Sequence, residues 1–143
     1  MSDHREVRIE LGETGFTSEI RVGDHFYLAD EPVSLGGKDL GPAPYELLAS
    51  ALGACTVMTL RMYADLKKWD LKGLNVEVSY RKEDSDDGKS KVDMFTREIE
   101  FIGDLDEKQR ERMLAIANKC PVHKTLSSTI ETSEVAPNKN SRI

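Results

Sequence analysis

The sequence predicts an α+β fold in which antiparallel sheet packs around one long buried helix. Residues 44–70 form the longest stretch that is apolar enough for a central helix. Runs that alternate apolar and polar residues precede and follow it, and short turns join them as hairpins. Grouped strands with hairpin connections argue against a parallel α/β sheet. With 143 residues and 38% hydrophobic content, the chain is expected to form a single domain.

Strands and a loop are expected in the N-terminal region, residues 1–43. Residues 5–11, 16–22 and 25–30 alternate as strand residues do, and Gly23 with Asp24 is a tight hairpin signal. Residues 31–43 hold two prolines and three glycines without an apolar period. This composition predicts a loop that leads into the central helix and can shape a pocket at its start.

The predicted central helix carries two apolar stripes. The first follows steps of four and three residues, and it contains Leu48, Leu52, Cys55, Thr59, Met62 and Leu66. The second lies beside it and contains Leu47, Ala51, Ala54 and Met58. A helix that is apolar around so much of its circumference should be enclosed by the rest of the protein or by a partner subunit.

The remaining elements fall within residues 71–136, and a polar tail follows at 137–143. Lys72 and Gly73 are expected to close the helix, after which residues 74–82 and 91–104 form a long hairpin. Asp104 resembles the start of a second helix over residues 107–119. Pro121 interrupts that helix, and residues 122–128 are compatible with one further turn before a short strand at 129–135.

Composition narrows the classes of partner. A net charge of −6 disfavours binding to nucleic acid and to anionic membranes. The N-terminus lacks an apolar stretch that could act as a secretion signal, so we expect a cytoplasmic protein. Two cysteines are too few for a four-cysteine zinc site, and His123 near Cys120 lacks a second pair of ligands. We therefore expect no metal.

The two cysteines have two interpretations. Each can be a small buried hydrophobic residue, which is the commoner role of a free cysteine. However, Cys55 and Cys120 fall on the predicted core-facing sides of the two long helices, so packing could bring their sulfur atoms together. In a peroxide-reducing dithiol, one thiolate forms a sulfenic acid and the second thiol condenses with it. Such chemistry would be plausible if the two sulfurs meet.

A thiolate at Cys55 would need a cation from elsewhere, because the middle of an apolar helix favours the neutral thiol. The candidates are Arg21 on the second strand, Lys38 in the loop and Arg61 on the helix, although Arg61 points about 120° away. The sequence does not choose among them.

Two motifs resemble the OsmC/Ohr family: PYELLASALGAC at residues 44–55 and CPVHKTL at 120–126. The segments GGKDLGPAPYELL and LRMYADLKKWDLKG are most similar to the YhfA-like branch of that family. The resemblance implies an intertwined homodimer with its long helices back to back and an active site at the subunit interface.

The resemblance also implies a thiol-dependent peroxidase that reduces organic hydroperoxides in oxidative stress defence. By motif, Cys55 is similar to the peroxidatic cysteine and Cys120 to the resolving one. A dithiol such as a lipoylated protein would supply the reducing equivalents, and no metal or organic cofactor is implied. The alternative is a non-catalytic dimer that binds a small apolar or thiol ligand at the interface pocket.

The sequence departs from the family pattern at two positions. Tyr45 occupies the place, ten residues before Cys55, of a glutamate that holds a catalytic arginine in the family, and Glu46 is its neighbour. The loop before the helix has no arginine, and Lys38 is its only lysine. Glu46, Lys38 and Arg21 are therefore the candidate activating residues.

Overall fold

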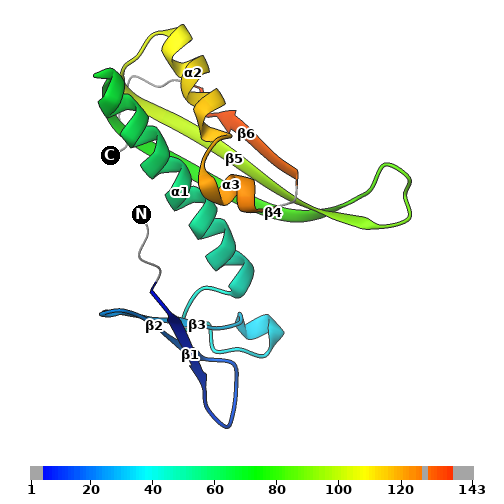
Figure 1. The fold of residues 1–143 in the computed structure, drawn as a ribbon. Coiled ribbons are helices and arrows are strands. Elements are labelled where there is room, and N and C mark those ends of the chain that lie inside the picture. Colours follow the sequence, from blue (N-terminus) through cyan, green and yellow to red (C-terminus); the bar gives the residue numbers. More distant parts are fainter. Residues whose placement is uncertain (1–4, 127–128, 137–143) are drawn as a thin grey trace. The chain divides into compact units, whose positions relative to one another are not determined.

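The computed structural model describes residues 5–126 and 129–136, and the chain divides into two compact units, Met1–Leu48 and Ala49–Ile143 (Figure 1). The longest helix, α1 (Pro44–Lys67), begins in the first unit and continues into the second. Two sheets and a central helix confirm the α+β prediction. The predicted tail at 137–143 lies outside the described residues.

The first unit contains a three-stranded antiparallel meander of β1 (Val7–Leu11), β2 (Ser18–Val22) and β3 (His25–Ala29). Gly23, with φ 57°, sits at the first position of the two-residue turn that pairs Val22 with His25. Glycine adopts this positive φ without strain, so the predicted hairpin forms here.

The loop after β3 includes one 3₁₀ turn, η1 (Val33–Leu35), and is anchored by a buried carboxylate. Asp30 accepts hydrogen bonds from Thr17 Oγ1 at 2.7 Å, Glu31 N at 2.7 Å and Leu40 N at 3.3 Å. These bonds lower the pKa of Asp30, and the bond from Thr17 is the largest cause. One ionised side chain thereby closes the loop onto the end of β2–β3.

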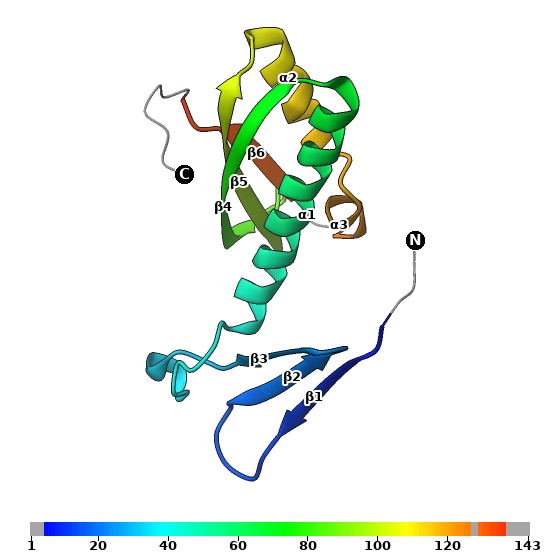
Figure 2. The same cartoon turned by 90° about the vertical axis from the view of Figure 1, so that its left-hand side faces the viewer.

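The second unit contains a sheet of β4 (Asp70–Asp84), β5 (Lys91–Asp104) and β6 (Thr129–Glu134). The long β4–β5 hairpin is antiparallel, as predicted, whereas β6 joins the other side of β5 in parallel. Figures 1 and 2 show α1 and α2 (Glu107–Ala117) on the same face of this sheet. They enclose a core of Leu60, Ala64, Leu71, Ile99, Phe101, Leu105, Met113, Ile116 and Ala117.

Two predicted helix boundaries were wrong. Lys68, with φ 60°, ends α1 before Lys72 and Gly73, which instead lie in β4 where the strand register shifts. At the start of α2, Asp106 rather than Asp104 is the N-cap, and it exchanges hydrogen bonds with Gln109 in a capping box. Asp104 and Asp106 offer the same local capping signal, and packing of Leu105 into the core selects Asp106.

The buried face of α1 also differs from the predicted stripes. The side chains that the single chain buries follow four-residue steps: Leu52, Thr56, Leu60 and Ala64. Met58, Met62 and Leu66 are 62%, 65% and 77% exposed. By length and composition α1 could cross a membrane, but the core helix of a soluble protein meets the same criterion. The chain therefore leaves one apolar side of α1 uncovered, and the predicted enclosure is not reached within one subunit.

Candidate functional site

A fully buried arginine marks the candidate site. Arg97 lies on β5 between Phe95 and Ile99, in the alternating set that faces the helices, and its exposed fraction is 0%. Its Nη1 donates to Thr56 Oγ1 at 2.8 Å and to Ala117 O at 3.1 Å. The guanidinium therefore joins β5 to both α1 and the end of α2.

The second terminal nitrogen of Arg97 reaches the segment after α2. Arg97 Nη2 donates to Asn118 Oδ1 at 3.0 Å and lies 2.9 Å from His123 Nδ1. Because a guanidinium has no acceptor, His123 Nδ1 must accept, and the imidazole is neutral with its hydrogen on Nε2. Burial first, and then the charge of Arg97, lower the pKa of His123, which agrees with this tautomer.

Within the described residues, Arg97 has no carboxylate partner. Its four hydrogen-bond acceptors are all neutral, and its buried Nε has no partner there. A buried cation without an anion is costly, so an anion nearby would be strongly stabilised. Burial lowers the pKa of Arg97. Negative charge on the neighbouring thiols of Cys120 and Cys55 opposes this effect and raises the pKa.

Cys120 is the cysteine at the centre of this arrangement. It is fully buried and forms the N-cap of α3 (Pro121–Thr125), where its Sγ accepts a 3.3 Å hydrogen bond from His123 N. Thr56 Oγ1 lies 3.9 Å from the same sulfur. Cys120 thus belongs to the turn after α2 and not to the apolar face of that helix, because Pro121 lacks the N–H that a continuing helix requires.

Cys55 lies next to Thr56 on α1 and is partly buried. Burial raises the pKa of the Cys55 thiol, and a hydrogen bond to Cys120 and the charge of Cys120 raise it further. Bonds to Val122 and Thr59 oppose this effect. The fold therefore brings both predicted cysteines into one interacting pair, and both are free thiols.

The cations that the sequence offered as activators of Cys55 make contacts with other residues. Arg61 donates to Leu71 O at 2.7 Å and pairs with Asp65 at 3.7 Å. In the first unit, Arg21 pairs with Glu19 at 3.6 Å, and its guanidinium stacks over a phenyl ring, that of Phe26.

The other two candidates also belong to the first unit, where they lie near the start of α1. Glu46 Oε1 accepts from Ala43 N at 2.7 Å, which caps the beginning of the helix. The backbone N–H of Lys38 contributes to the lowered pKa of Asp30, after the larger effect of the Thr17 bond. The sequence did not predict Arg97, the cation next to the cysteines. The pattern that could have indicated it is a charged residue at an inward-facing position of β5, two residues from the apolar Phe95 and Ile99.

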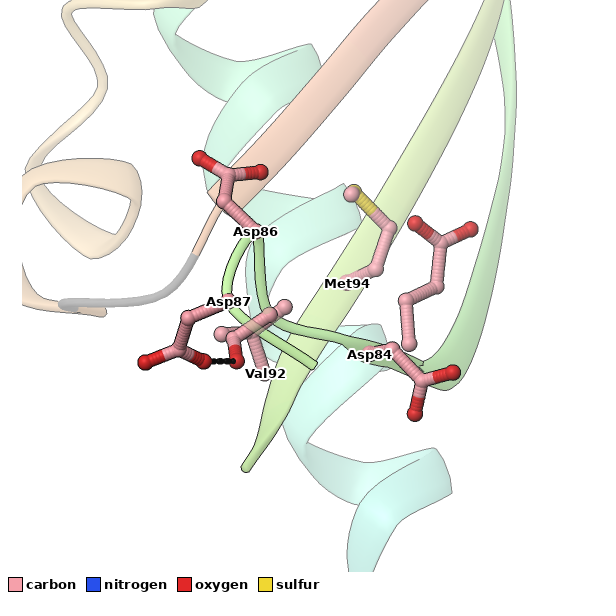
Figure 3. Close-up of a pocket in the computed structure, with 7 residues that line it drawn as sticks. Asp84, Asp86, Asp87, Val92 and Met94 are labelled. Atoms are coloured by element: carbon pink, nitrogen blue, oxygen red, sulfur yellow. Dashed lines mark hydrogen bonds between the residues drawn. The ribbon is translucent and has the colours of Figure 1, made fainter. Parts of the chain in front are cut away.

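The pocket found in the second unit is formed at the β4–β5 tip and lies among acidic side chains. It has a volume of about 520 Å³ and is lined by residues 83–87, Val92 and Met94. Figure 3 shows Asp84, Asp86 and Asp87 pointing in different directions. Ser85 Oγ donates a hydrogen bond to Asp87 Oδ1 at 2.6 Å. Across the described residues, no three histidine, cysteine or acidic side chains are grouped to hold a metal ion.

The sequence pattern that defines the family described as OsmC-like protein matches residues 36–134. The chain belongs to this family. The match spans both cysteines, Arg97 and the whole of α1, so the OsmC-like resemblance of the two motifs is confirmed at the level of the family. A search of curated proteins finds no match.

Solved OsmC-like structures share the fold. An OsmC-like protein from Mycoplasma pneumoniae is 18% identical and has a TM-score of 0.78, with 96% of this chain and 100% of that chain covered. A putative osmotic stress induced and detoxification response protein from Psychrobacter arcticus is 20% identical, with a TM-score of 0.76 and coverages of 94% and 97%. The organic hydroperoxide resistance protein OhrB of Bacillus subtilis is 17% identical, with a TM-score of 0.66 and coverages of 92% and 96%.

Proposed function

We propose that this OsmC-like protein is a thiol-dependent peroxidase that reduces organic hydroperoxides in oxidative stress defence. The observation that carries the proposal is the cluster of Cys55, Cys120 and Arg97, in which the described residues give Arg97 no carboxylate partner. A positive charge buried beside two thiols favours their ionised forms. The organic hydroperoxide resistance protein among the structural relatives gives additional support for this substrate class.

In the proposed reaction, Cys55 attacks because its thiol is the less buried of the two. Its sulfur takes one oxygen of the O–O bond and becomes a sulfenic acid, while the other oxygen leaves and is protonated to an alcohol. Cys120 then attacks the sulfenic sulfur, and a disulfide forms as water leaves. A dithiol such as a lipoylated protein reduces that disulfide and closes the cycle.

The proposal includes a cytoplasmic location and a homodimeric state. Cytoplasmic thiols are kept reduced, which a dithiol cycle requires. The dimer is supported by the exposed side of α1, where Met58, Met62 and Leu66 follow one another at four-residue steps. An apolar helix face of this kind is typical of a surface that a second subunit covers. No cofactor beyond the dithiol reductant, and no nucleic acid or membrane partner, is part of the proposal.

Peroxide consumption by the full chain tests the proposal. With cumene hydroperoxide and dihydrolipoamide, Cys55→Ser should abolish turnover, whereas Cys120→Ser should allow one oxidation and then accumulate over-oxidised Cys55. Ala115→Ser is the matched control, because it introduces the same hydroxyl at an exposed position of α2. Full turnover by Cys55→Ser would remove the proposal.

The raised pKa of Cys55 favours a second candidate function. In that case the protein is a non-catalytic dimer that binds a small apolar or thiol ligand at its interface. It would then react with peroxide no faster than a free thiol, and Cys55→Ser would leave the rate of peroxide loss unchanged.

A further inference from the structure

The guanidinium of Arg97 spans the two segments that carry the cysteines, and its first terminal nitrogen holds the segment of Cys55. Arg97 Nη1 donates to Thr56 Oγ1 at 2.8 Å, and Thr56 directly follows Cys55 on α1. The Thr56 hydroxyl gives its own hydrogen to Leu52 O at 2.7 Å, so its oxygen faces the guanidinium as an acceptor. This part of α1 is thereby fixed against β5.

The second terminal nitrogen holds the segment of Cys120. Arg97 Nη2 donates to Asn118 Oδ1 at 3.0 Å and to His123 Nδ1 at 2.9 Å. Asn118 lies two positions before Cys120 in the sequence, and His123 lies three positions after it. The turn that carries this cysteine is therefore held at both of its ends.

A backbone carbonyl also connects the guanidinium to Cys120. Ala117 O accepts from Arg97 Nη1 at 3.1 Å and from Cys120 N at 3.4 Å. Ala117 is the last residue of α2, and the final carbonyls of a helix need partners from outside it. A cation is favourable at this end of a helix. Because the two donors share one acceptor, a displaced guanidinium would also displace the backbone of Cys120.

The base of the Arg97 side chain is fixed as well. Arg97 lies on the central strand of its sheet, opposite Val78 of β4 and Thr132 of β6. Ser133 Oγ donates to Arg97 O at 3.2 Å. A planar fork that projects from a strand paired on both sides has few alternative positions, so it can set the distance between two neighbouring segments.

We propose that Arg97 is a positioning residue, which holds Cys55 and Cys120 at the spacing and orientation that their disulfide requires. The role depends on the two ends of a planar group. A lysine at this position would keep the positive charge, but its single ammonium could not hold α1 and the turn after α2 in the same geometry. The shape of the side chain can therefore be tested separately from its charge.

In the proposed peroxidase cycle, on which this consequence rests, Arg97 serves the second step. The Cys120 sulfur attacks the sulfenic sulfur of Cys55, so that an S–S bond forms and the S–O bond breaks. The hydroxyl leaves as water with the proton of the Cys120 thiol. Two groups held in place react as if they were highly concentrated, and a displacement of about 1 Å can cost about a hundredfold.

The equilibrium of the full chain with reduced and oxidised glutathione tests the proposal without peroxide. In this exchange the two protein thiols become a disulfide, while oxidised glutathione becomes two glutathione thiols. The equilibrium constant is the effective concentration of the two cysteines for each other. The reaction is quenched with acid, and the reduced and disulfide forms are quantified by mass spectrometry of the intact chain.

Arg97→Lys should lower the effective concentration by about tenfold to a hundredfold, because it keeps the charge and removes the fork. Arg81→Lys is the matched control. It makes the same substitution at an exposed arginine of β4, which contacts Glu83 and Thr96, and should leave the value unchanged. Circular dichroism establishes that each variant is folded. A folded Arg97→Lys with the native value overturns the proposal, because the charge would then be sufficient.

Asn118→Ala is a second test that keeps the arginine. It removes one acceptor on the Cys120 side of the guanidinium without changing either cysteine or any charge. The effective concentration should fall, by less than in Arg97→Lys. If Arg97→Lys does not fold, Asn118→Ala decides alone, and an unchanged value overturns the proposal.

The positioning role and the proposed function can fail separately. If the effective concentration falls in both variants but the native protein does not turn over peroxide, the peroxidase is refuted and the positioning role stands. Peroxide turnover by the native protein, with an unchanged effective concentration in both variants, gives the reverse result. If glutathione forms no disulfide between Cys55 and Cys120 in the native protein, the positioning role is overturned, and the attack of Cys55 on peroxide is decided by its own assay.

Discussion

Arg97 donates a 2.8 Å hydrogen bond to the hydroxyl of Thr56, and both residues are fully buried in the second unit. The bond fixes the middle of α1 against β5 at the point where Cys120 also contacts Thr56. A single hydroxyl therefore links the helix that carries Cys55 to the cation beside Cys120. The packing of α1 and the chemistry of the cysteine pair depend on the same contact.

Replacing that hydroxyl separates its two roles. Thr56→Val keeps the shape but leaves one Arg97 donor unpaired, so we expect a loss of about 1–3 kcal/mol in the free energy of unfolding. The loss is measured by urea denaturation. Thr56→Ser is the control, since it retains the hydroxyl and removes a methyl group. Equal stability of the valine and serine variants would show that the bond to Arg97 contributes little.

His123 should resist protonation. Burial and the charge of Arg97 both lower its pKa, so its imidazole midpoint should fall below the ordinary value of about 6.5. The folded pKa is the lower one, so His123 contributes stability above pH 6.5 that is lost as pH falls through the folded pKa. NMR titration of the imidazole measures the midpoint.

Arg97→Met should raise that midpoint, because it removes the second cause of the shift. Lys124→Met is the matched control, as it removes an exposed cation from the next position of α3. A larger rise in Lys124→Met than in Arg97→Met would contradict the contact between Arg97 and the ring.

The Asp30 carboxylate should make the loop after β3 sensitive to acid. Its pKa is lowered, first by the Thr17 bond, so its contribution to stability is complete above the ordinary value of about 3.9. The contribution disappears as pH falls through the lower folded value. The difference in unfolding midpoint between the native protein and Asp30→Asn should therefore be constant near neutrality and shrink in acid. A difference that stays constant throughout would rule out this linkage.

Met62→Lys should weaken the proposed homodimer. A charge placed on the exposed apolar side of α1 would have to be buried when a second subunit covers that face. Analytical ultracentrifugation should show a shift from dimer towards monomer, with the circular dichroism of the monomer retained. Ala115→Lys makes the same change in charge at an exposed position of α2 and should remain dimeric. Identical association of both variants would exclude this face as the dimer contact.

Local patterns in the sequence determined the secondary structure and the family. Alternation of apolar residues predicted the strands of both sheets, the glycine at position 23 predicted a hairpin, and the long apolar run predicted α1. These signals are local, because side-chain periodicity and turn conformation depend on residues a few positions apart. The two cysteine motifs were likewise sufficient to identify the OsmC-like family.

Tertiary structure alone decided which residues surround the sulfurs. Arg97 appears in the sequence as one charge among many in β5, and Thr56 lies outside both predicted apolar stripes of α1. Their meeting with Cys120 depends on the pairing of β5 with its neighbours and on the rotation of α1, which places the 52–56–60–64 row inward. That rotation is chosen by packing across the whole core, since a helix with two apolar sides has no local reason to bury one of them.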